Sequence, residues 1–372
     1  MQTDFSDALN TVFTPSWAAI LGRETEKSEP ILIPQAAGRR VLITGAGGFI
    51  GSEMVRVLAA SGAQKIILLD VAEQPLFTID TEMTARGYGG RCVPILGSVC
   101  DGALLTAILD DHRPAIILHA AALKHVPLME RNPFAAVETN SLGTWRLAQT
   151  ALEHGVEKTI LVSTDKAVAP HSIMGASKRI AELAILAHPA FATAVRLVNV
   201  IGSPGSVGPL FADQIAHGGP VTVTHPAVRR FFLTLHDVVA LLAQALLVAP
   251  ARGLLVPDTG DSVLIADLAQ RMIAASGSDI PIVFTELRPG DKLEESAISP
   301  RERLAGYAAP GLRRVLSPSS ADLETHMAGV ESAIAARDLP LLLRLVQTLV
   351  PDYEPSARLR AVGSEFAPAS AP

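Results

Sequence analysis

The feature that most constrains the fold of this chain is an alternation of short apolar runs with helical patterns, which begins at residue 39. The first run, at 41–43, is closed by a glycine-rich turn and is followed by a helical pattern over 49–60. Further apolar runs recur between helical segments, at 66–69, 93–96, 116–118, 160–162 and 194–198. Short strands that are apolar on both faces are typical of a parallel sheet covered by helices on each side. The sequence therefore predicts an α/β fold with a doubly wound parallel sheet.

The turn after the first run carries three evenly spaced glycines, Gly45, Gly48 and Gly51. Gly45 allows the tight turn, Gly48 allows a pyrophosphate to approach the backbone, and Gly51 lets the helix pack against the strand. The helix begins at Phe49 and Ile50, and its N-terminus offers free N–H groups to phosphate. A glycine pattern alone is weak evidence, but this one stands between a strand and a helix. We therefore predict a dinucleotide-binding site.

Asp70 closes the second apolar run and indicates which dinucleotide binds. Its carboxylate is expected to accept hydrogen bonds from the adenosine ribose hydroxyls, and its charge would repel a 2′-phosphate. Val71 and Ala72 follow, so no arginine stands next to Asp70 to compensate for that repulsion. We therefore expect the cofactor to be NAD rather than NADP.

The same patterns divide the chain into four regions. Residues 1–38 show weak periodicity and are interpreted as an N-terminal extension and linker. The regular alternation over 39–200 predicts the NAD-binding domain. Over 201–354 the alternation is irregular, and we expect this mixed region to complete the sheet and to form a smaller substrate-binding lobe. The end, 355–372, closes on alanines and prolines and is expected to be a disordered tail.

The composition narrows the class of protein. A net charge of −6 argues against binding of nucleic acid, which needs a basic face. No apolar run reaches about 18 residues, the minimum length of a membrane span, and the acidic N-terminus does not resemble a secretory signal. The two cysteines, Cys92 and Cys100, are too few for a zinc site and suit a reducing compartment. We therefore expect a cytoplasmic enzyme that contains no metal.

Four further motifs carry a resemblance to a known family. They are His-Ala-Ala-Ala-Leu-Lys-His-Val-Pro at 119–127, Ser-Thr-Asp-Lys-Ala-Val at 163–168, Met-Gly-Ala-Ser-Lys-Arg at 174–179 and Leu-Arg-Pro-Gly-Asp-Lys-Leu at 287–293. With the evenly spaced glycines, they resemble the nucleotide-sugar 4,6-dehydratases of bacterial surface polysaccharide biosynthesis, in their methionine-bearing subgroup. Those enzymes are extended short-chain dehydrogenases/reductases with a Rossmann domain. The segment 20–24 also resembles the part that joins the membrane half of long members to the catalytic half, which implies a short form here.

The resemblance implies a defined reaction. In this family, a bound NAD takes a hydride from carbon 4 of a UDP-sugar, and the proton on carbon 5 is then removed. Water leaves across carbons 5 and 6, and the hydride returns to carbon 6. The site needs a base for the carbon 4 hydroxyl, a base for carbon 5 and an acid for the departing hydroxide. The default substrate is UDP-N-acetylglucosamine.

The resemblance assigns the proton transfers to one strand end. Asp165 would protonate the leaving hydroxide, Lys166 would be the base for carbon 5, and Thr164 would hydrogen-bond the carbon 4 oxygen. The base for the carbon 4 hydroxyl stays open, with Asp165 as the first choice. The alternative interpretation is a solvated Asp–Lys pair. Against it, this chain has seven lysines beside 24 arginines, and four of the seven lie inside the motifs, at Lys124, Lys166, Lys178 and Lys292.

Lys178 matches the family lysine whose amine reaches the nicotinamide ribose. Ordinary relatives place a tyrosine four residues earlier as the base, whereas this chain has Met174, whose thioether cannot transfer protons. None of the three tyrosines, Tyr88, Tyr307 and Tyr353, has a lysine four residues after it. Because methionine offers no proton to either face of the sugar, we expect carbon 5 to lose and regain its proton on one face. The product would then retain its configuration and have the xylo arrangement.

The resemblance also implies the other binding residues. Those near the cofactor, besides the glycine turn and Asp70, are Ser98, Val99, Ala120, Ala121, Ala122 and Lys178. Those near the nucleotide-sugar are Lys124, His125, Asn199, Val207, Thr222, Arg230, Arg288 and Glu295. Arg230 and Arg288 would clamp the diphosphate, because a planar guanidinium binds phosphate oxygens in pairs, and Glu295 would hold the uridine ribose. The family's usual residues are replaced in the sugar pocket at Leu123, Ser172 and Val198. The exact sugar therefore stays open.

Two functions other than dehydration are also compatible with the motifs. A 4-epimerase shares the first oxidation but needs no acid at carbon 6, so the Asp165–Lys166 pair favours dehydration. A non-catalytic nucleotide-sugar-binding protein is favoured by Met174 and opposed by the intact Thr-Asp-Lys motif.

In this superfamily the helices predicted at 133–154 and 172–187 often pair between subunits, and both are rich in alanine here. We therefore predict a homo-oligomer, at least a dimer.

Overall fold

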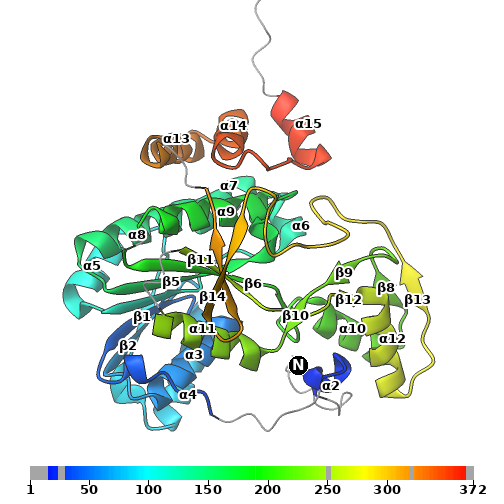
Figure 1. Cartoon of the computed structure of the whole chain (residues 1–372), viewed down its shortest axis with the longest axis horizontal. Helices are drawn as coiled ribbons and strands as arrows, with labels where there is room; N and C mark the ends of the chain where they lie inside the picture. The colour runs from blue at the N-terminus through cyan, green and yellow to red at the C-terminus, as the bar shows by residue number, and fades with distance from the viewer. Residues whose placement is uncertain (1–15, 24–29, 189, 249–252, 319–321, 366–372) are drawn as a thin grey trace, which may run out of the picture.

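The computed structural model describes residues 16–23, 30–188, 190–248, 253–318 and 322–365. Within these residues the centre is a nine-stranded sheet of order β14-β15-β11-β6-β5-β4-β1-β2-β3 (Figure 1). The strands are β1 (Arg40–Thr44), β2 (Lys65–Asp70), β3 (Cys92–Leu96), β4 (Ile116–His119), β5 (Lys158–Thr164), β6 (Ala192–Leu197), β11 (Gly253–Pro257), β14 (Arg303–Ala309) and β15 (Leu312–Leu316). All neighbours from β3 to β11 are parallel, and β15 and β14 add an antiparallel edge. The predicted doubly wound parallel sheet is confirmed.

Successive residues of each central strand pack into different apolar cores. In β1, Val41 and Ile43 belong to the core on one face of the sheet, and Leu42 belongs to the core on the other face. The first face is covered by α3 (Phe49–Ala60), α4 (Glu73–Ala85) and α11 (Leu235–Val248), and the second by α5 (Gly102–His112), α8 (Gly143–Glu153) and α9 (Ile173–Leu186) (Figure 1). Because both faces are buried, the strands need apolar residues at nearly every position. This is why continuous runs mark them in the sequence.

A smaller lobe follows β6 and packs around a core of its own. Its elements are β7 (Asn199–Val200), α10 (Val207–Ala216), β8 (Val221–Val223), β9 (Arg229–Arg230), β10 (Phe232–Leu233), β12 (Val263–Leu264), α12 (Ile265–Ser276) and β13 (Ile282–Phe284). The aromatic rings of Phe211 and Phe232 lie at its centre with Leu268. In Figure 1 the lobe lies beside the sheet, next to β6.

The N-terminal segment is docked on this lobe. Helix α2 (Trp17–Ile20) and the next residue bury Ile20 and Leu21 in the lobe core. The Arg23 guanidinium donates a hydrogen bond to the carbonyl of Phe232 at 2.8 Å. The sequence predicted only an extension and linker over 1–38, so this docking is a tertiary feature that weak periodicity did not indicate. Residues 1–15 and 24–29 of the expected extension and linker lie outside the described residues.

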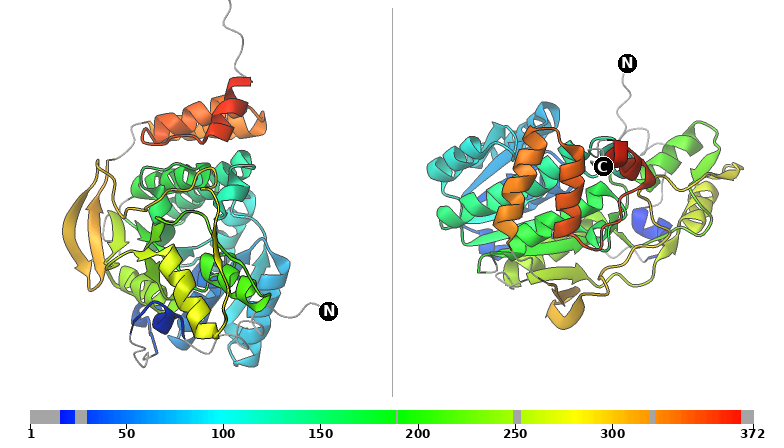
Figure 2. Two further views of the ribbon diagram at one scale, coloured as in Figure 1. Left: turned by 90° about the vertical axis from the view of Figure 1, so that its right-hand side faces the viewer. Right: turned by 90° about the horizontal axis from the view of Figure 1, so that it is seen from above.

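A helical hairpin forms a third layer above the second face of the sheet. Helices α13 (Leu323–Ala335) and α14 (Leu339–Leu349) share an apolar core with α6 (Val126–Met129), α7 (Pro133–Val137) and α9 (Figure 2). Between α7 and α8 the chain forms one turn of π-helix, η3 (Glu138–Leu142), and α13 packs on it. The hairpin therefore covers, within one chain, part of the helical surface that the sequence assigned to contacts between subunits.

The end of the chain is more ordered than the sequence indicated. We expected disorder from residue 355, whereas Ala357–Glu365 forms helix α15 (Figure 1). Burial explains the order: Tyr353 and Leu359 join the apolar core of the hairpin, and the buried hydroxyl of Ser356 donates a hydrogen bond to Glu130. Residues 366–372 lie outside the described part. No helix in the described part of the chain combines the length and apolarity needed to cross a membrane.

Candidate active site

The glycine turn between β1 and α3 is packed too closely to accept side chains. Gly45 has a φ of 69°, and a β-carbon there would lie 2.7 Å from the amide nitrogen of Ala121. A β-carbon at Gly51 would overlap the carbonyl oxygen of Gly45. At Gly47, which the predicted spacing does not single out, a β-carbon would lie 2.6 Å from the side chain of Pro75. The turn thus presents bare backbone at a helix N-terminus, a geometry suited to a pyrophosphate.

Asp70 holds this turn in place. Its Oδ2 accepts a hydrogen bond from the amide of Gly47 at 2.8 Å, and its Oδ1 accepts one from the amide of Ala72 at 2.9 Å. Each oxygen of a carboxylate keeps a second lone pair, so the predicted bonds to ribose hydroxyls are compatible with this arrangement. The structure adds a function that the sequence did not indicate, a link between the end of β2 and the glycine turn.

Replacing Gly51 with alanine is expected to weaken dinucleotide binding by about tenfold or more, because overpacking of a tight contact costs about 1–3 kcal/mol. The added methyl group would push α3 away from the turn. Titration of the purified variant with NAD measures the effect. Gly102→Ala is the matched control, since a β-carbon at this first residue of α5 meets nothing within 4 Å. Equal affinities for the two variants would contradict the assigned role.

A chain of buried hydrogen bonds joins the ends of β1 and β4. His119 Nδ1 lies 2.6 Å from Thr44 Oγ1, and its Nε2 lies 2.8 Å from Thr144 Oγ1. Burial and the nearby charge of Lys178 lower the pKa of His119 to about 3, so the ring is neutral. The amide of Ala121 donates to Thr44 Oγ1 at 3.3 Å. No role was predicted for His119 or Thr44, although each is the polar residue that closes an apolar strand.

The other predicted cofactor residues lie at neighbouring strand ends. The amide of Ala120 donates to the carbonyl of Thr44 at 3.0 Å, and Ala122 follows as an exposed residue. Beyond β3, Val99 is buried. The Ser98 hydroxyl accepts a hydrogen bond from the amide of Cys100 at 3.1 Å. The carboxyl ends of parallel strands share one edge of a sheet, so these residues fall on the same side as the glycine turn.

The predicted proton-transfer residues meet where β5 ends. The chain turns through η4 (Asp165–Ala167) directly after Thr164. Because the resemblance assigns the proton transfers to Thr164, Asp165 and Lys166, we call 164–167 the catalytic turn. Asp165 Oδ1 accepts hydrogen bonds from Thr164 Oγ1 and Lys166 Nζ, each at 3.0 Å. Lys166 Nζ also donates to Asn199 Oδ1 at 3.1 Å. Asp165 Oδ2 is buried without a hydrogen-bond partner among the described residues. Because buried carboxylate oxygens are normally bonded, it is a candidate acceptor for a substrate hydroxyl.

Lys166 is held in its charged form by neighbouring acids. Burial by itself would lower the pKa of Lys166, but the carboxylates of Asp165 and Glu295 outweigh this effect and raise it. Arg230 acts in the opposite direction. Glu295 is buried, and its Oε2 lies 3.5 Å from Lys292 Nζ. A residue expected at the uridine ribose therefore also acts electrostatically on the predicted carbon 5 base.

Helix α9 carries the predicted cofactor lysine and the methionine one turn earlier. Lys178 Nζ donates to the carbonyl of Val162 in β5 at 2.8 Å. Burial lowers the pKa of Lys178 to about 8, although the charge of Glu182 opposes this shift. The amine can therefore lose or gain a proton near neutral pH. Met174 is 3% exposed and belongs to the apolar core shared with α6 and the α13–α14 hairpin.

Helix α9 is fixed by a close contact with the catalytic turn and by hydrogen bonds from η3. A β-carbon at Gly175 would overlap the carbonyl oxygen of Lys166, so helix and turn are in direct backbone contact. From η3, Asn140 accepts a hydrogen bond from the amide of Leu123 at 2.8 Å and donates one to Ser177 Oγ at 2.9 Å. The sequence did not point to Asn140, because one amide in a helical pattern carries no signal by itself.

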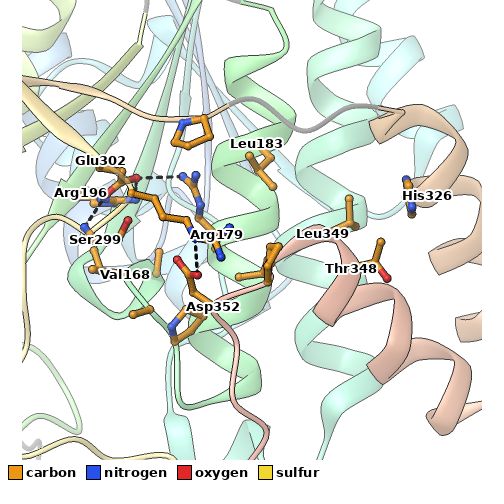
Figure 3. A pocket seen from close by; sticks show the side chains of 17 residues that line it. Val168, Arg179, Leu183, Arg196, Ser299, Glu302, His326, Thr348, Leu349 and Asp352 are labelled. Carbon is orange, nitrogen blue, oxygen red and sulfur yellow. Dashed lines mark hydrogen bonds and ion pairs between the residues drawn. The ribbon is translucent and has the colours of Figure 1, made fainter.

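A buried ion network lies behind the catalytic turn. Arg196 on β6 donates to Glu182 at 2.8 Å and to Glu302 at 2.7 Å (Figure 3 shows Arg196 with Glu302). The hydroxyl of Ser163 donates to the same Glu182 at 2.7 Å. Through Ser163, the network thus links the end of β5, next to the catalytic turn, to α9 and β6. The sequence did not indicate this network, because its members, from Ser163 to Glu302, are separated by up to 139 positions along the chain.

Lys124 and His125 extend from the end of β4 to the lobe. Lys124 Nζ donates to the carbonyl of Pro204 at 2.8 Å. A β-carbon at Gly205 would lie 2.5 Å from His125 Cε1, so the ring rests on this glycine. Burial lowers the pKa of both side chains. The structure therefore brings these two predicted residues to the turn before α10, whose first residue is Val207.

The two arginines predicted to bind the diphosphate meet at the segment 288–293: Arg288 belongs to it, and Arg230 is hydrogen-bonded to it. The Arg230 guanidinium donates to the carbonyls of Lys292 at 2.8 Å and Leu293 at 3.0 Å. Arg288 is exposed and pairs with Asp291 at 2.8 Å. Thr222 is not joined to this group, since its hydroxyl accepts a hydrogen bond from Gln214 at 2.7 Å in the lobe. Among the described residues, no group of His, Cys, Asp and Glu side chains could hold a metal ion.

Comparison with known sequences gives these residues a family. The profile of the family described as "Polysaccharide biosynthesis protein" matches residues 41–315. The chain is 42% identical over 294 residues to the capsular polysaccharide biosynthesis protein CapD of Staphylococcus aureus, an alignment that covers 76% of this chain and 49% of that protein. It is 43% identical over 336 residues to the probable polysaccharide biosynthesis protein EpsC of Bacillus subtilis, which covers 87% of this chain and 53% of that protein. The chain thus spans about half the length of these curated relatives.

A shorter relative carries the name of a specific activity. The chain is 31% identical over 272 residues to the UDP-N-acetylglucosamine 4,6-dehydratase (inverting) of Campylobacter jejuni, covering 70% of this chain and 78% of that protein. It is 36% identical over 270 residues to the UDP-glucose 4-epimerase of Rickettsia canadensis, with the same two coverages. Both a dehydratase and an epimerase are therefore among its relatives.

Solved structures agree with the fold. The dTDP-glucose 4,6-dehydratase DesIV of Streptomyces venezuelae, solved with NAD bound, has a TM-score of 0.61 and 26% identity, and the match covers 69% of this chain and 87% of that one. Since the family profile covers most of the chain and the sheet has the expected order, this chain belongs to the polysaccharide biosynthesis protein family of extended short-chain dehydrogenases/reductases, with a Rossmann fold.

Proposed function

We propose that this protein is an NAD-dependent 4,6-dehydratase that converts a UDP-N-acetylhexosamine, by default UDP-N-acetylglucosamine, into its 4-keto-6-deoxy derivative. The observation that carries the proposal is the Asp165–Lys166 pair, 3.0 Å apart at the end of β5. A carboxyl group beside an amine supplies an acid for the departing hydroxide and a base for carbon 5. The names of the dehydratases from C. jejuni and S. venezuelae support this reaction class, and those of CapD and EpsC support a role in polysaccharide biosynthesis.

The residues around the glycine turn fit NAD. Gly45 and Gly51 allow close backbone contacts that a β-carbon would prevent, and Asp70 keeps lone pairs for the ribose hydroxyls. Lys178 would reach the nicotinamide ribose with its amine. When bound, NAD would supply the hydride acceptor for carbon 4 and the hydride donor for carbon 6.

The protein's own groups would move the protons. Asp165, through its unpartnered Oδ2, would take the proton of the carbon 4 hydroxyl and later deliver it to the hydroxide that leaves carbon 6. Thr164 would hydrogen-bond the carbon 4 oxygen. Lys166, as the neutral amine, would remove the carbon 5 proton and return it when the double bond is reduced. One proton is thus taken and given by each group, so both are restored after a turnover.

The test is incubation of the purified protein with UDP-N-acetylglucosamine, with the mass of the sugar nucleotide followed over time. Loss of the mass of one water indicates dehydration. A new isomer of unchanged mass would instead support the second candidate, a 4-epimerase, which the relative named UDP-glucose 4-epimerase favours. Binding of the sugar nucleotide without any product would support a non-catalytic binding protein.

Replacing Glu295 with glutamine is expected to shift the pH dependence of carbon 5 exchange to lower pH. Lys166 acts as a base only when neutral, so exchange rises as the pH passes its pKa. Glu295 raises this pKa, and the uncharged amide would let it fall. Deuterium uptake at carbon 5, measured across a pH series, gives the shift. The matched control is Glu294→Gln, whose carboxylate lies beside Arg229 at 3.5 Å and is largely exposed. A shift to higher pH, or an equal shift in the control, would contradict the assignment.

We propose retention of configuration at carbon 5. Inversion needs a proton donor on the face opposite Lys166, and Met174 cannot donate a proton. Met174 is also buried among apolar side chains, which offers no substitute donor at this position. The test is turnover in deuterated water, with proton couplings across carbon 5 read from the NMR spectrum of the product. Deuterium in the arabino arrangement would refute retention. The inverting relative from C. jejuni is a suitable reference enzyme.

The homo-oligomer stays a prediction of this proposal. The α13–α14 hairpin occupies part of the face of α7 and α9, so a subunit contact through these helices would have to use the remaining surface, including α8. Light scattering at micromolar concentration distinguishes a dimer from a monomer.

A further inference from the structure

A segment near the C-terminus reaches the back of the proposed active site. We call residues 350–359 the strap; it runs from the end of α14 into the first turn of α15. It lies beyond the residues that the family profile matches, 41–315. Its buried residues include Val350, Tyr353, Ser356 and Leu359. Three of them pack in the same apolar core as Met174, so the strap belongs to the surroundings of α9.

The strap contacts α9 through Glu130. Glu130 Oε1 accepts a hydrogen bond from the amide of Ile173, the first residue of α9, at 2.7 Å. Glu130 Oε2 accepts one from the hydroxyl of Ser356. Glu130 is 2% exposed, and burial raises its pKa. A carboxylate this deeply buried is costly unless both oxygens are bonded. Ser356 therefore helps to determine where Glu130, and with it the start of α9, lies.

The strap also contacts the loop that leaves the catalytic turn. The amide of Glu354 donates a hydrogen bond to the carbonyl of Pro170 at 3.1 Å. A cavity of about 340 Å³ lies between this loop, α9 and the strap, and its lining includes Val168, Arg179 and Asp352 (Figure 3). Side chains do not fill the space behind the loop, so packing on that side is incomplete. The hydrogen bond from the strap therefore adds to the bond that Lys292 Nζ donates to the carbonyl of Val168 at 2.6 Å in holding the loop.

We propose that the strap is a positioning element, which fixes the catalytic turn with Lys166 relative to α9 with Lys178. Its two anchors are the hydroxyl of Ser356, acting through Glu130, and the backbone N–H of Glu354. The inference rests on the proposed reaction and adds positioning residues to it. Val207 and Thr222, which are expected near the nucleotide-sugar, lie on α10 and β8, and these elements pack around the separate core of the lobe. Loosening the strap should therefore lower kcat and leave KM for the UDP-sugar nearly unchanged.

The first test replaces Ser356 with alanine, with Ser356→Thr as the conservative variant that keeps the hydroxyl. A misplacement of about 1 Å can cost up to about a hundredfold in rate, and we expect Ser356→Ala to lower kcat by about tenfold with KM changed by less than about twofold. Hydrogen exchange of the peptide 171–178, measured by mass spectrometry, should be faster. Ser356→Thr should restore both values. Ser332→Ala, on the outer face of α13, is the matched control and should change neither.

The second test separates the backbone anchor from any side-chain effect. Glu354→Pro removes the N–H that bonds to Pro170, whereas Glu354→Ala keeps it. The proline variant should reproduce the loss of kcat, and the alanine variant should behave like the wild type. This pair also decides the question if Ser356→Ala does not fold.

The outcomes separate the strap from the proposed reaction. Exchange at 171–178 that is unchanged, or faster exchange without a loss of kcat, would overturn the positioning role. A rise in KM equal to the loss of kcat would do the same. If the wild type forms no dehydrated product, the proposed function fails, and the exchange measurements alone then decide whether the strap holds α9.

Discussion

Replacing Lys166 with alanine is expected to slow dehydration by about a thousandfold, within the range of about 10²–10⁴ for a lost general base. The amine of Lys166 is held 3.0 Å from Asp165 and 3.1 Å from Asn199, and no other amine is bonded to the catalytic turn in the part of the chain that the structure describes. Exchange of the carbon 5 proton with deuterated water should fall in parallel with product formation. Both are read from one NMR time course.

Two further variants separate the base from the charge of Lys166. Lys166→Arg keeps a cation beside Asp165 but stays protonated, so it should bind the substrate and still fail to exchange carbon 5. Lys65→Ala is the control for a lysine outside the site; within the described residues its side chain makes no hydrogen bond or ion pair. A Lys166→Ala variant that exchanges carbon 5 at the normal rate would remove the assigned base.

Replacing Lys178 with methionine is expected to be the other severe change, with a loss of turnover of about a hundredfold or more. The methionine is similar in length and apolar, so it suits the buried position, but it supplies neither a donor for the nicotinamide ribose nor a proton. Because the pKa of Lys178 is lowered to about 8, the native amine can exchange protons at neutral pH. We expect the variant to retain less NAD through purification and to form little 4-keto intermediate.

Lys158→Met is the matched control for this change. Lys178 lies on α9 and donates to a carbonyl of β5, whereas Lys158 is the first residue of β5 itself. Lys158 also donates to a backbone carbonyl, that of Leu246 at 3.0 Å, but at the end of the strand opposite the catalytic turn. Its loss should leave NAD content and turnover unchanged. Equal losses in the two variants would show that Lys178 stabilises the fold rather than the reaction.

The sequence predicted the position of the catalytic turn but not its charge state. Thr164, Asp165 and Lys166 are consecutive, so their proximity follows from one short motif. The raised pKa of Lys166 depends on Glu295, which joins the turn only when the chain has folded. Likewise, the motif located Lys178, whereas its lowered pKa results from burial between α9 and β5.

The interactions that sequence analysis missed share one property: their partners are distant in the chain. His119 bridges Thr44 and Thr144 across positions separated by 75 and 25 residues. Glu130 and Ser356 are 226 residues apart. No periodicity or local motif encodes such pairs, because each side chain by itself is compatible with an ordinary surface residue. Only the folded backbone brings them to hydrogen-bonding distance.

The sequence by itself determined the doubly wound sheet, the glycine turn and the order of the motifs. Burial on both faces requires apolar runs, and a turn that presses backbone against backbone requires glycine, so both leave local marks. The tertiary structure alone decided that the α13–α14 hairpin covers α7 and α9 and that the strap reaches Glu130. An apolar helix face indicates that something must cover it but does not specify what. That choice depends on the free energy of packing between segments far apart in the chain, which only the complete fold defines.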